Sequence, residues 1–207
     1  LLDQKRDMIM IDEFTSFLDR TTASVVAFNM QKICRRNGIK LIVATAHNDL
    51  EEFLKPDLKI DFKTGDGVVT TTPTVDDSNP FIPFLTIQDA DKHDFEHFIK
   101  YHYKSTKAVP GVKKMYKLMF NDTPIGLAVY AVASRMLSGR NIYFNKHYMT
   151  EKGYPKMDEV NTDFISASRF IIHPQYRGCG LGAWFTNETV QLIDKEFGRA
   201  FIEFSSV

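Results

Sequence analysis

The sequence has little of what secreted or membrane-bound proteins rely on. Two cysteines, Cys34 and Cys179, stand in 207 residues, so neither a disulfide framework nor a four-cysteine metal site can be built. No apolar run approaches the roughly 20 residues that cross a bilayer, and no basic-then-apolar leader opens the chain. We therefore expect a cytoplasmic protein that does not insert into a membrane.

An excess of charge of one sign is also missing. Lys and Arg together number 26, as do Asp and Glu, so no overall field recruits nucleic acid or an anionic membrane. A phosphate loop of the type Gly-x-x-x-x-Gly-Lys-Ser/Thr is absent as well, which excludes a complete P-loop nucleotide site. The sequence starts without methionine, and we expect a piece of a longer protein.

What the chain does have is a hydrophobic fraction of 43%, enough for one large packed domain or two small ones. Residues 164–172 read as a central strand in which Phe164, Ser166, Ser168 and Phe170 alternate with the residues between them. A glycine-rich turn follows, and then a helix that begins near residue 181 and stops at Gly198. Glycines leave the amides of such a turn unshielded, and the helix dipole adds partial positive charge, so the turn suits a phosphate.

The spacing Arg177-x-x-Gly180-x-Gly182 differs from the Gly-x-Gly-x-x-Gly of dinucleotide-binding turns. It resembles the acyl-CoA pyrophosphate loop of the GNAT acetyltransferase superfamily, Arg/Gln-x-x-Gly-x-Gly/Ala after a hydrophobic strand. The resemblance implies a GNAT-like mixed α/β domain over residues 84–207, truncated at its C-terminus, with acetyl-CoA as cofactor. The acetyl-CoA site it implies comprises Phe170, Ile171, Ile172, Arg177, Gly178, Cys179, Gly180, Leu181, Gly182 and Ala183. The alternative is a glycine-rich turn that binds nothing.

The chemistry of acetyl transfer is less well marked. A small-molecule or protein amine is the implied acceptor, and a base must take its proton. Glu203 and His147 are candidates by residue type alone, so the base remains unassigned, and the family's usual general-acid tyrosine would lie beyond Val207. A covalent role for Cys179 is not expected, because in such a loop the backbone N–H is what matters.

The first segment opens with a short apolar run at residues 8–11 that ends in Asp12 and Glu13. A buried parallel strand presents acids at its carboxyl edge in this way. Residues 22–36 then read as a helix and 41–47 as the next strand, followed by a capping box from Asn48 to Glu51. This order predicts a parallel sheet with a right-handed crossover.

Residues 12–20 resemble the Walker B and D-loop motifs of ABC-type ATPases, and residues 41–47 resemble the strand that ends in that family's switch histidine. The resemblance implies that Asp12 holds Mg²⁺ through water, Glu13 polarises the attacking water and His47 touches the γ-phosphate. Asp19 would face a second subunit, which allows a homodimer through this portion. Without a phosphate loop, residues 1–72 match only the C-terminal half of such a domain, which is a partial P-loop NTPase-type parallel sheet. The resemblance implies that ATP and Mg²⁺ would bind only in the full-length protein.

Between the two segments, residues 73–83 combine prolines, acids and Ser/Asn, the composition of an exposed linker. A helix over 89–103 contains His93 and His97 in a His-x-x-Glu-His pattern of zinc peptidases. Both histidines project away from the apolar face of this helix, so a solvated surface is the favoured interpretation.

Residues 134–163 form a long aromatic and polar insertion that could cover an acceptor site. Its mixture of aromatic and basic residues also allows nucleic-acid binding, which is not favoured without a basic excess.

Three functions fit these features. The first is an acyl-CoA-dependent N-acetyltransferase domain fused to a soluble ABC-type ATPase module. The second is an ABC-type ATPase whose GNAT-like domain is a non-catalytic binding module for a partner or nucleic acid. The third is the ATP-binding subunit of a membrane transporter, which the fusion makes less expected.

Overall fold

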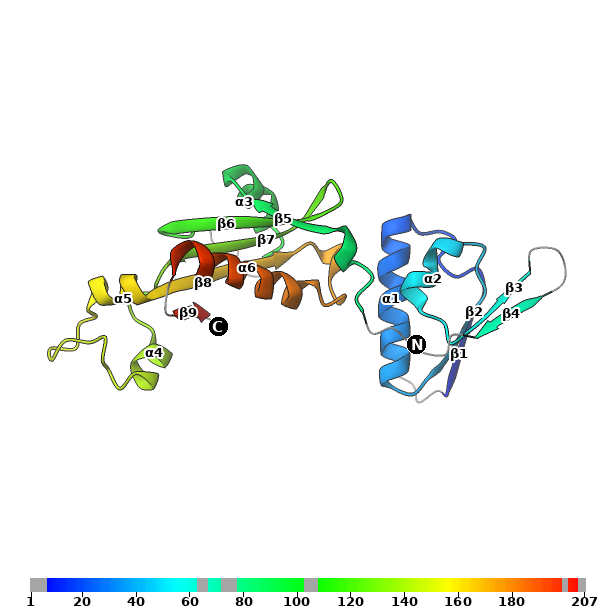
Figure 1. Ribbon diagram of the computed structural model, residues 1–207, viewed down its shortest axis with the longest axis horizontal. Coiled ribbons are helices and arrows are strands. Elements are labelled where there is room, and N and C mark those ends of the chain that lie inside the picture. The colour runs from blue at the N-terminus through cyan, green and yellow to red at the C-terminus, as the bar shows by residue number, and fades with distance from the viewer. Residues whose placement is uncertain (1–6, 63–66, 72–77, 103–107, 199–200, 205–207) are drawn as a thin grey trace. The chain divides into compact units, whose positions relative to one another are not determined.

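A computed structural model describes residues 7–62, 67–71, 78–102, 108–198 and 201–204. The chain divides into two compact units, unit 1 from Leu1 to Pro83 and unit 2 from Phe84 to Val207 (Figure 1). Each unit is described by itself.

Unit 1 is a small α/β arrangement in which β1 and β2 pair in parallel, with Ile11 opposite Val43 and α1 as the connection. The predicted strand, helix, strand order is therefore confirmed. An antiparallel hairpin of β3 and β4 follows, and residues 63–66 between the two strands lie outside the described residues. The elements are β1 (Met8–Ile11), α1 (Arg20–Arg36), β2 (Lys40–Val43), a 3₁₀ turn (Asn48–Leu50), α2 (Glu51–Leu54), β3 (Leu58–Asp61) and β4 (Val68–Thr71).

One face of the β1–β2 pair is packed and the other is open. Buried residues of α1 and of the chain around α2 cover the packed face, among them Ala23, Ala27 and Leu50. On the open face Met10 and Ile42 are 68% and 49% exposed. Parallel sheets are normally covered on both faces, so this pair of strands is incompletely covered within the described residues.

Two expectations for unit 1 are wrong in detail. No side chain caps the turn at Asn48, and Glu51 instead forms an ion pair with Lys59 at 2.6 Å, so the predicted capping box is absent. Within the predicted linker, Phe81 is fully buried and contacts the rings of Phe28 and Phe53. Burial of this phenyl ring outweighs the polar composition around it, so Phe81 packs in unit 1.

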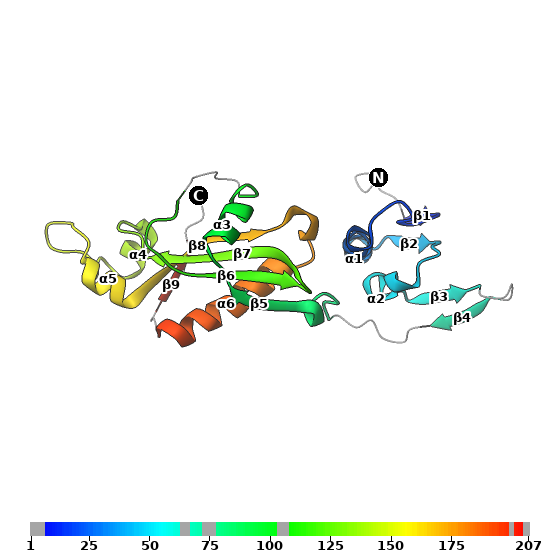
Figure 2. The same ribbon diagram turned by 90° about the horizontal axis from the view of Figure 1, so that it is seen from above.

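Unit 2 is a mixed α/β fold around a five-stranded sheet of order β5-β6-β7-β8-β9, in which β8 and β9 are parallel and the other neighbours antiparallel. Helix α3 lies on one face of the sheet and α6 on the other (Figure 2). The predicted mixed α/β class is confirmed. The elements are β5 (Leu85–Asp89), α3 (Lys92–Ile99), β6 (Val112–Phe120), β7 (Thr123–Val132), α4 (Ser138–Tyr143), α5 (Met157–Asp163), β8 (Phe164–Ile172), α6 (Leu181–Phe197) and β9 (Phe201–Phe204), with 3₁₀ turns at Ile82–Phe84 and Pro174–Tyr176.

The sequence of α6 explains its position. Leu181, Phe185, Thr189 and Ile193 recur every four residues and are all buried, which gives one face packed on the sheet. Gly198, with φ 55°, ends the helix in the left-handed conformation that glycine favours. The predicted helix and its stop are confirmed.

The alternation predicted along β8 is interrupted by a bulge. Val129 of β7 pairs with Arg169, but the next residue, Tyr130, pairs with Ala167, so Ser168 is the extra residue. Residues on either side of a bulge change faces relative to a regular strand. Ala167 and Phe170 therefore share one face of the sheet, and a simple period of two failed at this point.

The insertion at residues 134–163 contains two short helices, α4 and α5, and a core of Ala133, Tyr148, Val160 and Phe164. In the parts of the chain that the structure describes, no helix has the length and apolar character needed to cross a membrane.

Candidate functional site

The loop between β8 and α6 is shaped by two glycines in the left-handed region. Gly178 has φ 88° and Gly180 has φ 78°, and Gly180 is the N-cap of α6. The first N–H groups of a helix have no partner within the helix, and a glycine cap provides no side chain to accept from them. The amides of Leu181, Gly182 and Ala183 therefore have no side-chain cap.

The structure brings the predicted loop residues together, with some of their side chains buried in the core and two of the glycines exposed at the surface. Cys179 and Leu181 are 1% exposed and hold the loop to the core, whereas Gly178, Gly180 and Ala183 are exposed. The thiol of Cys179 is thus inaccessible, and what the loop presents to solvent is mainly backbone.

Hydrogen bonds to the end of β8 and to the residues after α3 hold this loop in place. The Nε of Arg177 donates to the carbonyl of Ile172 at 2.9 Å, and its Nη2 donates to the carbonyl of Tyr101 at 3.0 Å. His173 Nε2 lies 3.1 Å from the Tyr101 hydroxyl. The guanidinium of Arg177, predicted to bind cofactor, is therefore engaged at least in part in holding the loop, a function that the spacing did not reveal.

The environment of His173 also has an electrostatic consequence. Burial lowers the pKa of His173 below its ordinary value of 6.5, and the positive charges of His97, Lys100 and Arg177 lower it further. The neutral imidazole can accept a hydrogen bond from the backbone N–H of Gln175, which is 3.4 Å from Nδ1. Protonation of Nδ1 would remove this hydrogen bond, so the hydrogen bonding of the loop depends on the protonation state of His173.

The edge of β8 next to the loop is open in the described part of the chain. β9 pairs with β8 from Phe164 to Ala167, and the described residues place no strand against the following stretch on that side. The bulge at Ser168 lies where the pairing ends. The carbonyls of Ser168 and Ile172 accept from the side chains of Arg169 and Arg177, so an extended ligand can reach only the backbone between them.

Phe170, predicted to bind cofactor, packs within an aromatic cluster. Its ring lies 5.7 Å from that of Tyr130, 6.3 Å from Phe185 and 6.0 Å from Phe204. Tyr130 is fully buried and its hydroxyl is 2.9 Å from Thr189 Oγ1, and burial raises its pKa to about 12. The cluster joins β7, β8, α6 and β9 beside the open edge.

Neither candidate base is placed for that role. Glu203 Oε2 lies 2.9 Å from Arg140 Nη1 and its Oε1 accepts from the N–H of Ser134, with both charged side chains almost wholly buried. Both carboxylate oxygens of Glu203 are engaged by these partners, so Glu203 has a structural role in holding Arg140 and Ser134. His147 is largely exposed in the insertion and lies 3.9 Å from Glu159.

This buried pair was missed by sequence reasoning, because nothing in the local pattern marks Arg140 or Glu203 as buried. Arg140 also donates to the carbonyls of Ser134 and Arg135 and lies over the ring of Phe164. It thereby fastens the insertion to β9. A cavity of about 470 Å³ within the insertion is lined by Asn141, Lys146, Met149, Thr150, Glu151 and Gly153.

In unit 1 the structure brings the ends of β1 and β2 together. The N–H of Ala44 donates to the carbonyl of Ile11 at 2.9 Å, and the N–H of Phe14 donates to the carbonyl of Ala44 at 2.9 Å. Asp12 and Glu13 therefore leave the sheet at the same edge as the chain that leads to His47. Glu13 has φ 48°, a conformation uncommon for residues other than glycine, which marks a tight turn here.

The other predicted ATPase residues have local structural roles. Asp19 is the N-cap of α1 and accepts from the N–H and hydroxyl of Thr22, and these hydrogen bonds lower the pKa of its carboxyl. Asp12 accepts from the N–H of Glu13 at 2.9 Å. Mg²⁺ is usually held by carboxylates together with the phosphates of its nucleotide, and this sequence has no phosphate loop. The residues present do not fit Mg²⁺ by themselves.

The histidine pair of α3 lies at the surface, with His93 and His97 both exposed. In the described ranges, no group of three His, Cys, Asp or Glu side chains is arranged to hold a metal ion.

No protein-family model matches the chain, and no curated protein matches it significantly. Among solved structures, it is similar to a protein from Clostridium difficile 630 described as a possible acetyltransferase, at 13% identity and a TM-score of 0.39, over 60% of this chain and 80% of the other. It is also similar to an integron cassette protein from the mobile metagenome of V. cholerae, at 14% identity and a TM-score of 0.38, over 60% of this chain and 76% of the other. These values are too low to assign an activity, and neither protein is described as an ATPase.

Proposed function

We propose that unit 2 is an acyl-CoA-dependent N-acetyltransferase domain that uses acetyl-CoA and an amine acceptor from a small molecule or a protein. The observation that carries the proposal is the left-handed cap at Gly180, which leaves the first turn of a 17-residue helix without a capping side chain at an exposed loop. Such a helix start offers N–H groups and partial positive charge to an anion. The diphosphate of CoA is the anion that the sequence resemblance associates with this loop.

In this proposal, backbone groups contribute more to acetyl-CoA binding than side chains do. The turn from Gly178 to Ala183 would hold the diphosphate, and the open edge of β8 after Ala167 would pair with the pantetheine arm. Acetyl-CoA supplies the acetyl thioester that an amine attacks. The aromatic cluster around Phe170 would exclude water from one side of this edge.

Calorimetric titration of the whole chain with acetyl-CoA tests the proposal. We expect micromolar binding that is lost in Gly180→Trp, because the indole would fill the space in front of the helix start. Gly153→Trp is the matched control: Gly153 has φ 79°, close to that of Gly180, but lies in the insertion. Both variants carry the same backbone strain, so equal loss of binding in the two, or no binding by the unaltered chain, would overturn the proposal.

A second candidate rests on unit 1. We infer that unit 1 corresponds to the C-terminal half of an ABC-type ATPase domain, with unit 2 as a non-catalytic binding module in that case. The supporting observation is the parallel pairing of β1 and β2, which puts Asp12, Glu13 and the chain before His47 at one edge.

Because no phosphate loop is present, we expect the 207-residue chain neither to bind nor to hydrolyse ATP. Fluorescent-nucleotide titration and phosphate release measure this. Turnover that survives purification, and that disappears in Glu13→Gln, would contradict it.

A further inference from the structure

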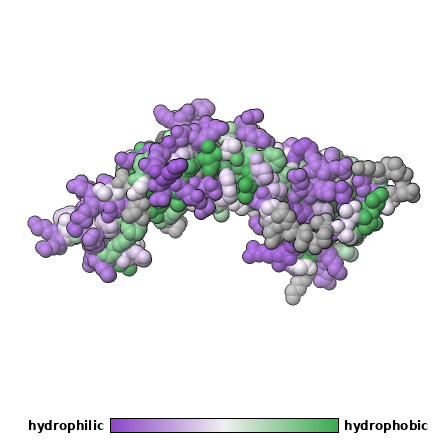
Figure 3. All heavy atoms as spheres, viewed as in Figure 1, coloured by the Kyte–Doolittle hydropathy of each residue, from purple (hydrophilic) through white to green (hydrophobic). Residues whose placement is uncertain are grey.

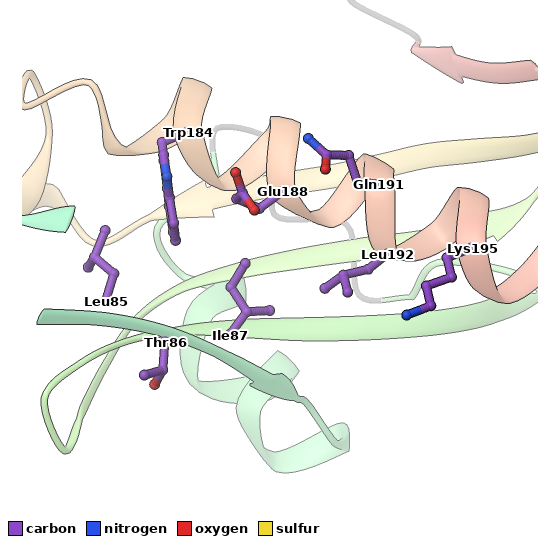
Figure 4. Close-up of a pocket in the computed structure, with 8 residues that line it drawn as sticks. All are labelled: Leu85, Thr86, Ile87, Trp184, Glu188, Gln191, Leu192 and Lys195. Carbon is purple, nitrogen blue, oxygen red and sulfur yellow. The ribbon is translucent and has the colours of Figure 1, made fainter. Parts of the chain in front are cut away.

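A shallow groove runs between β5 and α6 in unit 2 (Figure 4). Its volume is about 470 Å³, and Leu85, Ile87, Trp184 and Leu192 make it largely apolar, while Glu188 and Lys195 add one charge of each sign. Apolar residues reach the surface over these two elements in Figure 3. The walls are a strand edge and a helix face, which is the form of a surface that receives another protein.

The strand side of the groove is an edge that lacks the usual protection. β5 is the end strand of the sheet and, within the described residues, pairs with β6 alone. Natural proteins guard such edges with lysine, proline or inward-pointing charges. The five residues Leu85–Asp89 include neither lysine nor proline, and their one charge is at the last position. This edge can accept another strand.

The helix side runs along β5 in the same direction. Trp184, near the start of α6, lies above Leu85 at the start of β5 (Figure 4). Near the other end, Glu196 accepts from the hydroxyl of Tyr116, whose partner across the strands is Asp89 at the end of β5. The middle of β5, Ile87, therefore lies close to the middle of the exposed face of α6.

The two charges on this face are placed for a symmetric contact. Glu188 and Lys195 are seven residues apart, or about 10.5 Å along the helix, too far to pair with each other. Among the described residues neither of them forms an ion pair. The midpoint between them falls between Gln191 and Leu192, at the centre of the groove.

We propose that this groove is the interface of a homodimer and receives the same groove of a second copy of the chain. A two-fold axis through its centre pairs β5 with its copy in antiparallel fashion around Ile87 and lays the two α6 helices antiparallel on one face of the joined sheet. Glu188 of each copy then faces Lys195 of the other, as an isologous contact requires. Ile87 and Leu192 become buried near the axis.

The pairing on the opposite face of β5 is also acceptable, because the antiparallel arrangement sets Thr86 against Gln88 of the other copy, and both are uncharged. This interface involves unit 2 alone. It is independent of the acetyltransferase proposal and differs from the dimer that the ATPase resemblance implies for unit 1.

Sedimentation equilibrium of the whole chain tests the interface by charge reversal. We expect the unaltered chain to dimerise, and Glu188→Lys or Lys195→Glu each to raise the dimer dissociation constant about tenfold, because each variant sets like charges opposite each other twice. The double variant restores opposite charges and should return to within about threefold of the unaltered chain. Since the residues are two turns apart on one helix, recovery can come from a contact between copies and not within one.

Asp194→Lys is the matched control for Glu188→Lys, with the same charge change on an exposed position of α6 outside the groove. Ile87→Glu, which puts two carboxylates near the axis, should give a monomer whose circular dichroism is unchanged. A monomeric unaltered chain, single reversals that behave like Asp194→Lys, or a double variant that fails to recover would overturn the proposal.

A cross-linking measurement gives an independent answer. Gln191→Cys should form a disulfide-linked dimer on mild oxidation, and Asp194→Cys should not, because only position 191 lies near the axis. Both native cysteines are buried and do not interfere. Equal cross-linking of the two variants would contradict the proposed axis.

Discussion

Two glycines at the start of α6 have different reasons to be glycine. Gly180 has φ 78°, which a side chain makes costly, whereas an added Cβ at Gly182 would meet Ile172 Cγ1 at 3.7 Å, an ordinary contact. Gly180→Ala should therefore lower the free energy of unfolding by about 1–2 kcal/mol. Gly182→Ala should raise it by up to about 1 kcal/mol, because alanine is the better helix residue.

Urea denaturation measures the free energies of unfolding of the two variants. Acetyl-CoA titration of Gly182→Ala then shows whether that variant still binds the cofactor. The acyl-CoA loop pattern that this sequence resembles accepts alanine at the second position, so we expect acetyl-CoA binding by Gly182→Ala to stay within about twofold of the unaltered chain. A stabilised Gly182→Ala that no longer binds would mean that the phosphate needs the space at Gly182.

His173 should make stability depend on pH. Burial and nearby positive charges lower its pKa in the folded chain, so the unfolded chain takes up the proton first as the pH falls through 6.5. The stability associated with the neutral ring is present above pH 6.5 and is lost as the pH falls toward the lower pKa of the folded state. The free energy of unfolding should therefore decrease from pH 7.5 to pH 5.

His173→Gln should flatten that decrease, measured by urea denaturation at several pH values. His93→Gln, at an exposed position of the same unit, should leave it unchanged. Parallel pH profiles for the unaltered chain and His173→Gln would show that the ring does not contribute.

At the level of elements, the insertion is fastened to β9 by the buried pair of Arg140 and Glu203, whose side chains are 2% and 7% exposed. Removal of one partner leaves a buried charge uncompensated, so Glu203→Gln should lower the free energy of unfolding by about 3–5 kcal/mol. The double variant Arg140→Met, Glu203→Leu should be much closer to the unaltered chain, because apolar groups fill the same space. Thermal denaturation compares them, and a double variant as unstable as the single one would contradict this account.

The elements also show what the sequence could predict. Periodicity and glycine signals were sufficient for α6 with its stop at Gly198, and the strand at β8 was predicted with its observed bounds. The bulge at Ser168 could not be predicted, since it depends on pairing with β7. The burial of Phe81 and of the Arg140–Glu203 pair likewise depends on partners distant in sequence. Local sequence signals were enough to locate the loop, whereas contacts between residues distant in sequence determine which charged side chains are buried.

At the scale of the whole chain, the two units differ in how completely they are covered. Unit 2 encloses its sheet between α3 and α6, whereas unit 1 leaves Met10 and Ile42 of a parallel sheet exposed. Apolar side chains also reach the surface of the β3–β4 hairpin (Figure 3). We expect unit 1 to open at a lower denaturant concentration than unit 2.

The distribution of the two thiols allows each unit to be followed separately. Cys34 lies in α1 of unit 1 and Cys179 in the β8–α6 loop of unit 2, and both are 1% exposed. Maleimide labelling in increasing urea, with Cys34→Ala and Cys179→Ala to separate the sites, should modify Cys34 first. Simultaneous labelling of both thiols would mean that the chain unfolds as one cooperative block. Because each unit contains one buried cysteine thiol, the opening of each unit can be timed separately without an engineered labelling site.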